Sequence, residues 1–249
     1  MNFKIAVIVP SLDRLEFLIR LLNFYSLSEN SCHIYIGDAS EVDNSEVIKA
    51  KISANNFDYF HLPGLNDRKT ILFLSKKVKE KYMTIGGDDD FFIINSLILC
   101  ANFLDKNQDF RTAQGRAYLF TTIDDEINNK INKIYKYWSK NNIANQVSFE
   151  RFLNLSKNYF VSQFSLHRTD EFIEDSLDFI NCKNRQLGEY THCFTAILRG
   201  KSKYINCLHM IRHTHPKRDT SKVSYSTKLR NRYKFWNYSD NNHNPEFFF

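Results

Sequence analysis

The first hundred residues alternate between short apolar runs and amphipathic stretches. Residues 3–10, FKIAVIVP, form a continuous apolar run rich in β-branched side chains, and the run ends at a proline. Such a run is typical of a strand buried on both faces of a parallel sheet. In the stretch that follows, Leu15, Leu18 and Leu22 recur at helical spacing, so the sequence predicts a strand and then an amphipathic helix.

The same alternation continues as far as a glycine pair at residues 86 and 87. The predicted order is a strand at 32–40, a helix at 45–55, a strand at 57–64, a helix at 66–81 and a strand at 82–87. This order predicts an α/β fold with a doubly wound, mostly parallel central sheet flanked by helices. Ligands bind at the carboxyl ends of the strands in such sheets, where loops 10–14, 37–40 and 86–90 are expected to converge.

The composition is that of a globular protein. Of the 249 residues, 43% are hydrophobic and 25% are charged, which argues against a disordered chain. No apolar run reaches the roughly 18 residues needed to span a membrane, and the N-terminal run is broken too early by proline and charge to be a signal peptide. The five cysteines show no Cys-x-x-Cys spacing, so we expect free thiols and a cytoplasmic location.

The C-terminal part of the chain is strongly basic. Between residues 199 and 235, eleven Lys and Arg face one acid, Asp219, so this segment carries +10 and the remainder −4 of the net +6. Such a concentration of charge favours an anionic partner, for example a phosphate group, a membrane surface or nucleic acid. We therefore expect a domain at residues 1–220, followed by a basic and aromatic C-terminal extension at 221–249.

Three consecutive aspartates follow the last of the predicted strands, in the sequence IGGDDDFF at residues 85–92. Adjacent carboxylates about 6 Å apart repel by roughly 3 kcal/mol per pair at an effective dielectric near 20. Open water, a basic patch or a bound cation could offset this repulsion. Mg²⁺ is a candidate, because it is usually bound by one or two carboxylates together with substrate phosphates. If the segment is extended, Asp88 and Asp90 point to the same side and could share the cation, while Asp89 points away.

Four segments in this order, VIVPSLDR, IYIGDAS, GLNDRKT and IGGDDDFF, resemble the N-terminal half of the GT-A nucleotide-sugar glycosyltransferases, especially the family 2-like bacterial enzymes that build surface polysaccharides. The resemblance implies a GT-A (Rossmann-like) domain with a nucleotide-binding half at 1–120 and an acceptor half at 121–220. It also implies transfer of a sugar from a nucleoside diphosphate donor to a hydroxyl of a glycan or lipid-linked acceptor. A UDP-sugar would be the first donor to expect, with Mn²⁺ or Mg²⁺ as cofactor.

The resemblance also implies roles for residues at the strand ends. The expected donor-binding residues are Pro10, Ser11 and Arg14 at the border of the nucleotide pocket, Asp38 at the base or ribose, Arg68 at the base or diphosphate, Asp88 at the ribose or a metal-bound water, and Asp89 in support of the loop. Asp90 would be the direct ligand of the cation, with Asp88 beside it, and either His213 or His215 would complete the metal site. Arg212, Lys217 and Arg218 would neutralise the leaving diphosphate.

An inverting transferase of this type needs a general base to take the proton of the acceptor hydroxyl. The resemblance points to Glu189, near the start of the amphipathic run RQLGEYTHCFTAILRG at residues 185–200. Tyr190 follows it, so the family's usual Glu-Asp pair is missing, and an acid near a helix start is also a common capping residue. Rival carboxylates precede it in a crowded stretch that suggests an exposed helix face: Asp170, Glu171, Glu174 and Asp175.

Three other interpretations remain open. Residues 228–239, KLRNRYKFWNYS, interleave basic and aromatic side chains, as in a non-enzymatic protein that binds nucleic acid or an anionic membrane surface. For a glycosyltransferase, the same segment would contact the inner face of the cell membrane, and no nucleic acid is expected. GGDDDF is also similar to a diguanylate-cyclase motif, although the Phe-Lys-x-x-Asn-Asp segment of those enzymes is missing. The cysteines and histidines between residues 182 and 215 suggest a zinc module, although their spacing departs from the usual Cys-x₂₋₄-Cys pairs.

Overall fold

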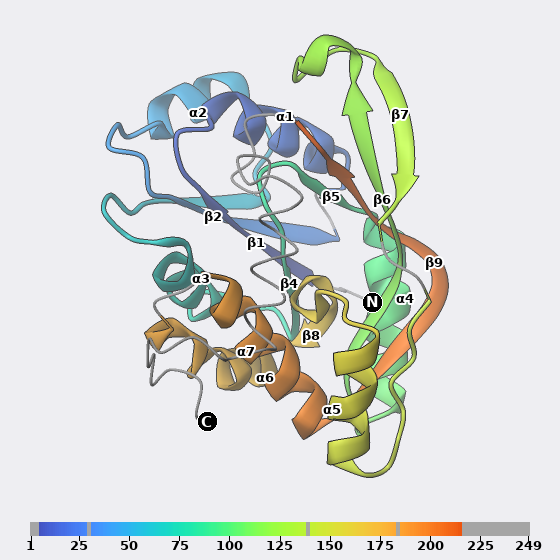
Figure 1. Cartoon of the computed structure of the whole chain (residues 1–249). Coiled ribbons are helices and arrows are strands. Elements are labelled where there is room, and N and C mark those ends of the chain that lie inside the picture. The colour runs from blue at the N-terminus through green and yellow to red at the C-terminus, as the bar shows by residue number, and fades with distance from the viewer. Residues whose placement is uncertain (1–4, 29–30, 138–139, 183–184, 216–249) are drawn as a thin grey trace, which may run out of the picture.

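A single mixed sheet with helices on both faces forms the body of the protein (Figure 1). The computed structural model describes residues 5–28, 31–137, 140–182 and 185–215. The predicted C-terminal extension at 221–249 lies outside these residues, as do Lys217 and Arg218. Within the described ranges, no helix combines the length and the apolar character that a membrane crossing requires.

The N-terminal third of the chain alternates strands and helices, as predicted. It comprises β1 (Ile5–Ser11), α1 (Leu15–Tyr25), β2 (Cys32–Asp38), α2 (Ser45–Lys51), β3 (Phe57–His61), α3 (Asp67–Ser75) and β4 (Tyr82–Ile85). β1 pairs in parallel with β2 and with β4, and β2 pairs in parallel with β3. The prediction of a parallel α/β unit in this part of the chain is therefore confirmed.

The rest of the chain adds antiparallel neighbours to this unit. It comprises β5 (Asp90–Phe92), α4 (Ile94–Lys106), β6 (Phe110–Thr122), β7 (Ile131–Lys136), α5 (Ser148–Lys157), β8 (Leu166–Arg168), α6 (Thr169–Ser176), α7 (Arg185–Arg199) and β9 (Lys201–His213). The strand order is β3-β2-β1-β4-β8-β6-β9-β5, and β7 pairs with β6 outside this path. The α/β class is confirmed, but the sheet is mixed beyond β4. The reason is that β8 pairs antiparallel with β4 and with β6, and β5 pairs antiparallel with β9 at the far edge.

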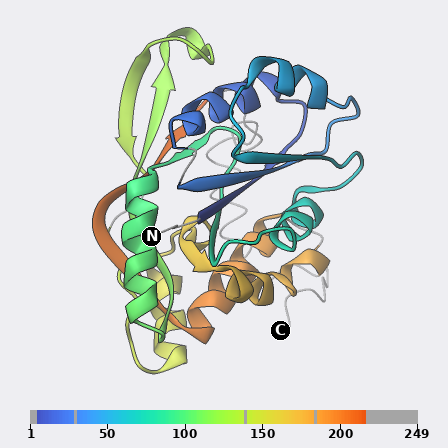
Figure 2. The same cartoon turned by 180° about the vertical axis from the view of Figure 1, so that it is seen from behind.

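Hydrophobic burial explains why the first strand and helix form where the sequence predicts them. Residues 5–9 of β1 are buried, and Phe17, Leu18, Leu22 and Tyr25 are buried residues of α1. Figure 1 shows α1 and α2 over one face of the β1–β2 region and α3, α6 and α7 under the other. The β6–β7 hairpin extends beyond the sheet in both views (Figure 1, Figure 2).

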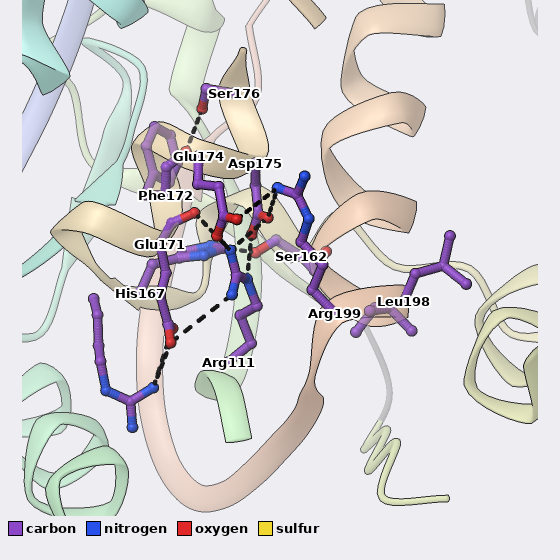
Figure 3. Close-up of polar contacts among 12 residues, drawn as sticks. Arg111, Ser162, His167, Glu171, Phe172, Glu174, Asp175, Ser176, Leu198 and Arg199 are labelled. Carbon is purple, nitrogen blue, oxygen red and sulfur yellow. Dashed lines mark hydrogen bonds and ion pairs between the residues drawn. The ribbon is translucent and has the colours of Figure 1, made fainter. Parts of the chain in front are cut away.

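An ion-pair cluster fastens α6 and α7 to β6 (Figure 3). This helix cluster consists of Arg111, Arg168, Glu171, Glu174, Asp175 and Arg199. The buried Asp175 accepts hydrogen bonds from Nε and Nη2 of Arg111 at 2.7 and 2.8 Å, and from Nη1 of Arg199 at 2.9 Å. Glu174 also pairs with Arg111, and Glu171 pairs with Arg168. The expectation of an exposed acidic face is therefore wrong for Asp175, because two arginines neutralise its buried carboxylate.

Candidate functional site

A tight turn places the three aspartates after β4. The backbone N–H of Asp90 donates to the carbonyl of Gly87 at 3.1 Å, which closes the turn. The preceding Gly86 has no room for a side chain, because a Cβ there would lie 2.8 Å from the Phe92 ring. The prediction of an extended segment is therefore wrong at Asp88 and Asp89, and strand alternation does not decide where the carboxylates point.

Asp88 is buried against the end of β1. Its Oδ2 accepts a hydrogen bond from Ser11 Oγ at 2.7 Å, and its Oδ1 accepts one from Arg14 Nη1 at 2.7 Å. Burial raises the pKa of the Asp88 carboxyl to about 6; the charge of Arg14 opposes this shift and that of Asp89 adds to it. A carboxyl group whose pKa is strongly perturbed by burial and by specific charges is typical of functional sites.

Asp89 lies between an arginine and a histidine. Its Oδ2 is 3.0 Å from His215 Nε2 and 3.4 Å from Arg14 Nη1. The carbonyl of Asp89 also accepts a hydrogen bond from the backbone N–H of His213 at 2.9 Å, which ties the end of β9 to the turn. The His215 ring packs against Phe17 of α1, with ring centroids 4.6 Å apart. The imidazole of His215 therefore contacts the carboxylate of Asp89 directly.

His213 connects β9 to α1 and to the end of β6. Its Nδ1 is 3.2 Å from Arg20 Nη1, and its Nε2 is 3.2 Å from Thr122 Oγ1. The ring stacks on Phe120, with a centroid separation of 4.8 Å and an interplanar angle of 11°. The two candidate histidines are thus both buried beside the aspartates, but their imidazoles meet different partners.

Asp90 is held by an arginine from the last strand. The antiparallel pairing of β5 and β9 puts Asp90 opposite Arg212. Arg212 Nε donates to Oδ1 at 2.6 Å and Nη2 donates to Oδ2 at 3.0 Å, a bidentate charge-assisted pair. Burial acts to lower the pKa of Arg212, but the charges of Asp90, Tyr137 and Asp89 and the hydrogen bonds to Asp90 together raise it. Asp90 therefore faces Arg212, whereas Asp88 faces Ser11 and Arg14, and the expected sharing of one cation by Asp88 and Asp90 is not the arrangement found.

Basic side chains offset the repulsion between the three aspartates. The strand-end cluster, as we name it, consists of Asp88, Asp89, Asp90, Arg14, Arg20, Arg212, His213 and His215. Burial lowers the pKa of Arg20, while the charges of two of the aspartates act in the opposite direction. Sequence reasoning named Arg14 and Arg212 but missed Arg20. A signal was present, since Arg14, Phe17 and Arg20 recur at a spacing of three on α1, and both guanidinium groups lie over the Phe17 ring.

Asp38, at the end of β2, organises the loop that follows it. Its Oδ1 accepts from the backbone N–H of Ser40 at 3.0 Å, and its Oδ2 accepts from Asn44 Nδ2 at 2.9 Å and Tyr59 Oη at 2.8 Å. The parallel register of β1 and β2 places Asp38 beside Ser11. Asp38 is therefore next to the strand-end cluster, with both carboxylate oxygens bonded to protein donors.

The loops after β1, β2 and β4 meet at one edge of the sheet, as the sequence predicts. The backbone N–H of Asp13 donates to Ser40 Oγ at 2.8 Å, and Ser11 reaches across to Asp88. Pro10 lies at the base of this edge, where β1 is still paired with β2. The predicted convergence of these polar loops at one edge of the sheet is therefore confirmed.

Arg68 and Glu189 belong to a second group, on α3 and α7. Arg68 is buried in the first turn of α3, and a Cβ on Gly188 of α7 would lie 3.1 Å from Arg68 Cδ. Glu189 Oε1 accepts a hydrogen bond from Tyr159 Oη at 2.9 Å. α3 and α7 lie on the opposite side of the sheet from α1 (Figure 1). The structure therefore brings the predicted site residues together in two groups rather than one.

The donor set for a metal ion is present but not preassembled. In the part of the chain that the structure describes, no three His, Cys, Asp or Glu side chains surround a common point. This finding gives no support to the zinc module. Carboxylate oxygens and imidazole nitrogen are nevertheless suitable donors for Mn²⁺ or Mg²⁺. Arg14 contacts both Asp88 and Asp89, and Asp89 also contacts His215.

No protein-family model matches the chain, and no curated protein matches it either. Its fold, however, is similar to crystal structures of TarS from S. aureus. For TarS 1-349 the TM-score is 0.57 at 14% identity, over 84% of this chain and 60% of that chain. The chain has the same fold as TarS.

Two further TarS structures have the same fold. The complex of TarS 1-349 with UDP-GlcNAc has a TM-score of 0.57 at 13% identity, over 89% of this chain and 61% of that chain. The complex with UDP has a TM-score of 0.51 at 15% identity, over 86% and 61%. The match thus spans about 60% of the TarS 1-349 chain.

Proposed function

We propose that this chain is a glycosyltransferase that moves a sugar from a nucleoside diphosphate donor to a hydroxyl acceptor. The observation that carries the proposal is the position of the strand-end cluster, at the carboxyl ends of β1 and β4 in a fold shared with TarS. One TarS structure holds UDP-GlcNAc and another holds UDP. A UDP-sugar is accordingly the donor that we propose.

The arginines of the strand-end cluster would stabilise the leaving diphosphate. When the bond from the anomeric carbon to the diphosphate breaks, its electron pair stays on the phosphate oxygen, where positive groups are most valuable. The Arg14 side chain is 20% exposed, whereas the Asp88 side chain that it contacts is 3% exposed. Arg14 is therefore the cation that an incoming diphosphate can reach, and Asp88 would hold it in place.

A divalent cation, Mn²⁺ or Mg²⁺, is part of the proposal. Asp88, Asp89 and His215 would hold it, because they supply oxygen and imidazole donors beside Arg14; the hydrogen bonds of Asp88 to Ser11 and Arg14 would then have to break. Asp90 is less suited than the sequence suggested, because Arg212 binds both of its oxygens in one bidentate pair. When bound, the cation would supply further positive charge at the leaving diphosphate.

Glu189 is the general base that we propose. The hydrogen bond from Tyr159 orients its carboxylate. In the reaction, Glu189 would take the proton of the acceptor hydroxyl while the hydroxyl oxygen attacks the anomeric carbon, which inverts that carbon. A bacterial glycan or lipid-linked glycan at the inner face of the cell membrane is the proposed acceptor. The alternative of a non-enzymatic binding protein depends on residues 228–239, which lie outside the described residues.

The test is release of UDP from UDP-GlcNAc and other UDP-sugars by the purified chain, with Mn²⁺, with Mg²⁺ and with EDTA. Arg14→Gln is expected to lower kcat/KM by about a hundredfold, and Glu189→Gln to lower kcat by about a hundredfold without weakening UDP binding. Asp58→Asn is the matched control, because the Asp58 side chain is 49% exposed and pairs with His33 away from the cluster. Absence of both UDP release and UDP binding in the wild type would refute the proposal.

A further inference from the structure

A cavity of about 370 Å³ opens beside the strand-end cluster, between α1, β5 and the β6–β7 hairpin. Its size lies within the range of roughly 300–1,000 Å³ that is usual for small-molecule sites. The residues that matter for its chemistry are Arg20, Phe24, Phe91, Phe120, Asn128 and Asn129. Three aromatic rings thus form the walls, and two amide side chains from the hairpin and one guanidinium group supply polar contacts. None of the residues that the sequence predicted for the donor lines this cavity.

Arg20 brings two unused hydrogen-bond donors to the cavity. Its guanidinium lies 5.2 Å from the ring centroid of Phe17 and 5.1 Å from that of Phe91. Nη1 donates to the carbonyl of Ile127 at 2.6 Å and lies 3.2 Å from His213 Nδ1. The charges of Asp88 and Asp89 act on Arg20 from a distance, but among the described residues no carboxylate forms an ion pair with it, and its Nε and Nη2 are buried without a hydrogen-bond partner. Unlike Arg14 and Arg212, Arg20 therefore retains N–H donors for an anionic group.

The cavity is in direct contact with the cluster. Phe120, which forms one wall, is the ring on which His213 stacks, and Arg20 contacts His213 from another wall. A molecule in the cavity would therefore lie one side chain away from the strand-end cluster, where the diphosphate is proposed to bind. A donor occupies the strand ends in the proposed function, so the neighbouring cavity suits the other substrate.

We propose that this cavity binds a saccharide unit that carries a phosphate or carboxylate group. The inference rests on the proposed function only in assigning this unit to the acceptor, as a part remote from the hydroxyl that Glu189 would deprotonate, because α7 lies on the opposite side of the sheet from α1 (Figure 1). Aromatic rings offer apolar faces to the C–H side of a sugar ring, and amides bond to its hydroxyl groups. The guanidinium of Arg20 forms charge-assisted hydrogen bonds with the anionic group. A neutral saccharide would leave Nε and Nη2 of Arg20 without an anionic acceptor.

The test measures binding of four probes to the purified full chain by ligand-observed NMR titration: glucose 6-phosphate, glucuronate, glucose and inorganic phosphate. The two anionic sugars are expected to bind at least about tenfold more tightly than glucose or phosphate, because only they use both the rings and Arg20. Better binding of glucose 6-phosphate would identify a phosphate-bearing unit, and better binding of glucuronate a carboxylate-bearing one. Equal binding of all four probes, or no binding at millimolar concentration, would overturn the inference.

Variants of cavity residues show whether the anionic sugars bind in this cavity. Asn128→Ala combined with Asn129→Ala is expected to weaken binding of the better anionic sugar by about threefold to tenfold, and Asn129→Trp is expected to abolish it by filling the mouth of the cavity. Arg20→Gln should reduce its affinity to that of glucose. Asn132→Ala is the matched control, because Asn132 is exposed on β7 and does not line the cavity. If Arg20→Gln does not fold, the two hairpin variants decide, and unchanged binding in both would overturn the inference.

UDP release by the wild-type chain separates this inference from the proposed function. If the chain releases UDP from a UDP-sugar but binds neither anionic sugar, the proposed function is supported and the inference about the cavity is overturned. If it binds an anionic sugar through Asn128 and Asn129, but neither binds UDP nor releases it from any donor, the binding site is supported and the proposed function is overturned.

Discussion

Two clusters in this molecule each combine three carboxylates with three arginines, and they differ in how the charges are spaced. In the helix cluster, Glu174 and Asp175 are adjacent in sequence, Glu171 lies one helical turn before them, and Arg111 lowers the pKa of Glu174. In the strand-end cluster, the acids are consecutive, and burial and a neighbouring acid raise the pKa of Asp88 to about 6. Equal numbers of charges therefore stabilise one region and leave the other with unfavourable electrostatics, as at many functional sites.

The largest difference between the clusters should appear in catalysis. Asp89→Asn is expected to lower kcat/KM for UDP-sugar turnover by about a hundredfold to a thousandfold, because it removes a proposed ligand of the cation that would stabilise the leaving diphosphate. Glu174→Gln in the helix cluster should leave kcat/KM per folded molecule within about twofold. UDP release at matched concentrations of folded protein is the measurement. Equal losses in both variants would contradict the division into a functional and a structural cluster.

The helix cluster should contribute more to stability. Arg111→Met is expected to lower the free energy of unfolding by about 3–5 kcal/mol, because the buried Asp175 loses its bidentate partner. The measurement is urea denaturation followed by circular dichroism. Lys49→Met is a control in the exposed Lys49–Glu46 pair and should change stability by less than about 1 kcal/mol. A loss below about 1 kcal/mol for Arg111→Met would show that Arg199 alone can neutralise Asp175.

The two clusters should respond to loss of an acid with opposite signs. The pKa of Asp88 is about 6 in the folded state, against roughly 3.9 in an unfolded chain, so the folded state binds more protons between these values. Its contribution to stability therefore falls as pH rises from about 4 to 6. Asp88→Asn is expected to raise the free energy of unfolding by about 1–3 kcal/mol at pH 8, with the gain absent near pH 4.

The matched variant in the helix cluster is Asp175→Asn. It should lower stability at pH 8, because Arg111 and Arg199 lose a charged partner in a buried position. Urea titrations of both variants at pH 4.5 and pH 8 compare the signs directly. A destabilised Asp88→Asn at pH 8 would mean that the contacts with Ser11 and Arg14 outweigh the burial of the Asp88 charge.

The smallest effect concerns a histidine next to the helix cluster. Burial lowers the pKa of His192 to about 3, and the charge of Arg111 adds to this effect. Because an unfolded histidine takes up a proton near pH 6.5, the folded state loses stability as pH falls below that value. His192→Leu should therefore gain about 1 kcal/mol at pH 5.5 relative to its own change at pH 8. Urea denaturation at the two pH values measures the difference, and an identical change at both would assign His192 a partner that stabilises its charged form.

Local patterns in the sequence were sufficient for the first half of the fold. The apolar run of β1 and the helical spacing in α1 predicted these elements, because each is fixed by burial of its own side chains. The strand order then predicted that Ser11, Asp38 and Asp88 lie at one edge of the sheet, and they do. The carboxyl ends of parallel strands must share an edge, so this inference needed no long-range information.

The orientation of the aspartates could not be predicted in the same way. The glycines before Asp88 form a turn, so the alternation of an extended strand does not apply. The partner of Asp90 is Arg212, 122 residues further along the chain, and no local pattern indicates that pairing. The spacing of Arg20 from Phe17 and Arg14 was a local signal, but the contact of Arg20 with Ile127, 107 residues further along the chain, could not be predicted from it.

The pairing of β5 with β9 has a consequence for biosynthesis. Asp90 is translated long before Arg212, and β9 is the strand that neighbours β5 in the sheet. Arg14, which pairs with Asp88 and Asp89, is translated before them, whereas Asp90 gains its partner only 122 residues later. A nascent chain halted before residue 200 would contain the parallel strands β1, β2 and β4, but it would lack Arg212, the partner of Asp90. Ribosome-stalled chains of increasing length should become resistant to protease in this segment only after β9 has left the exit tunnel.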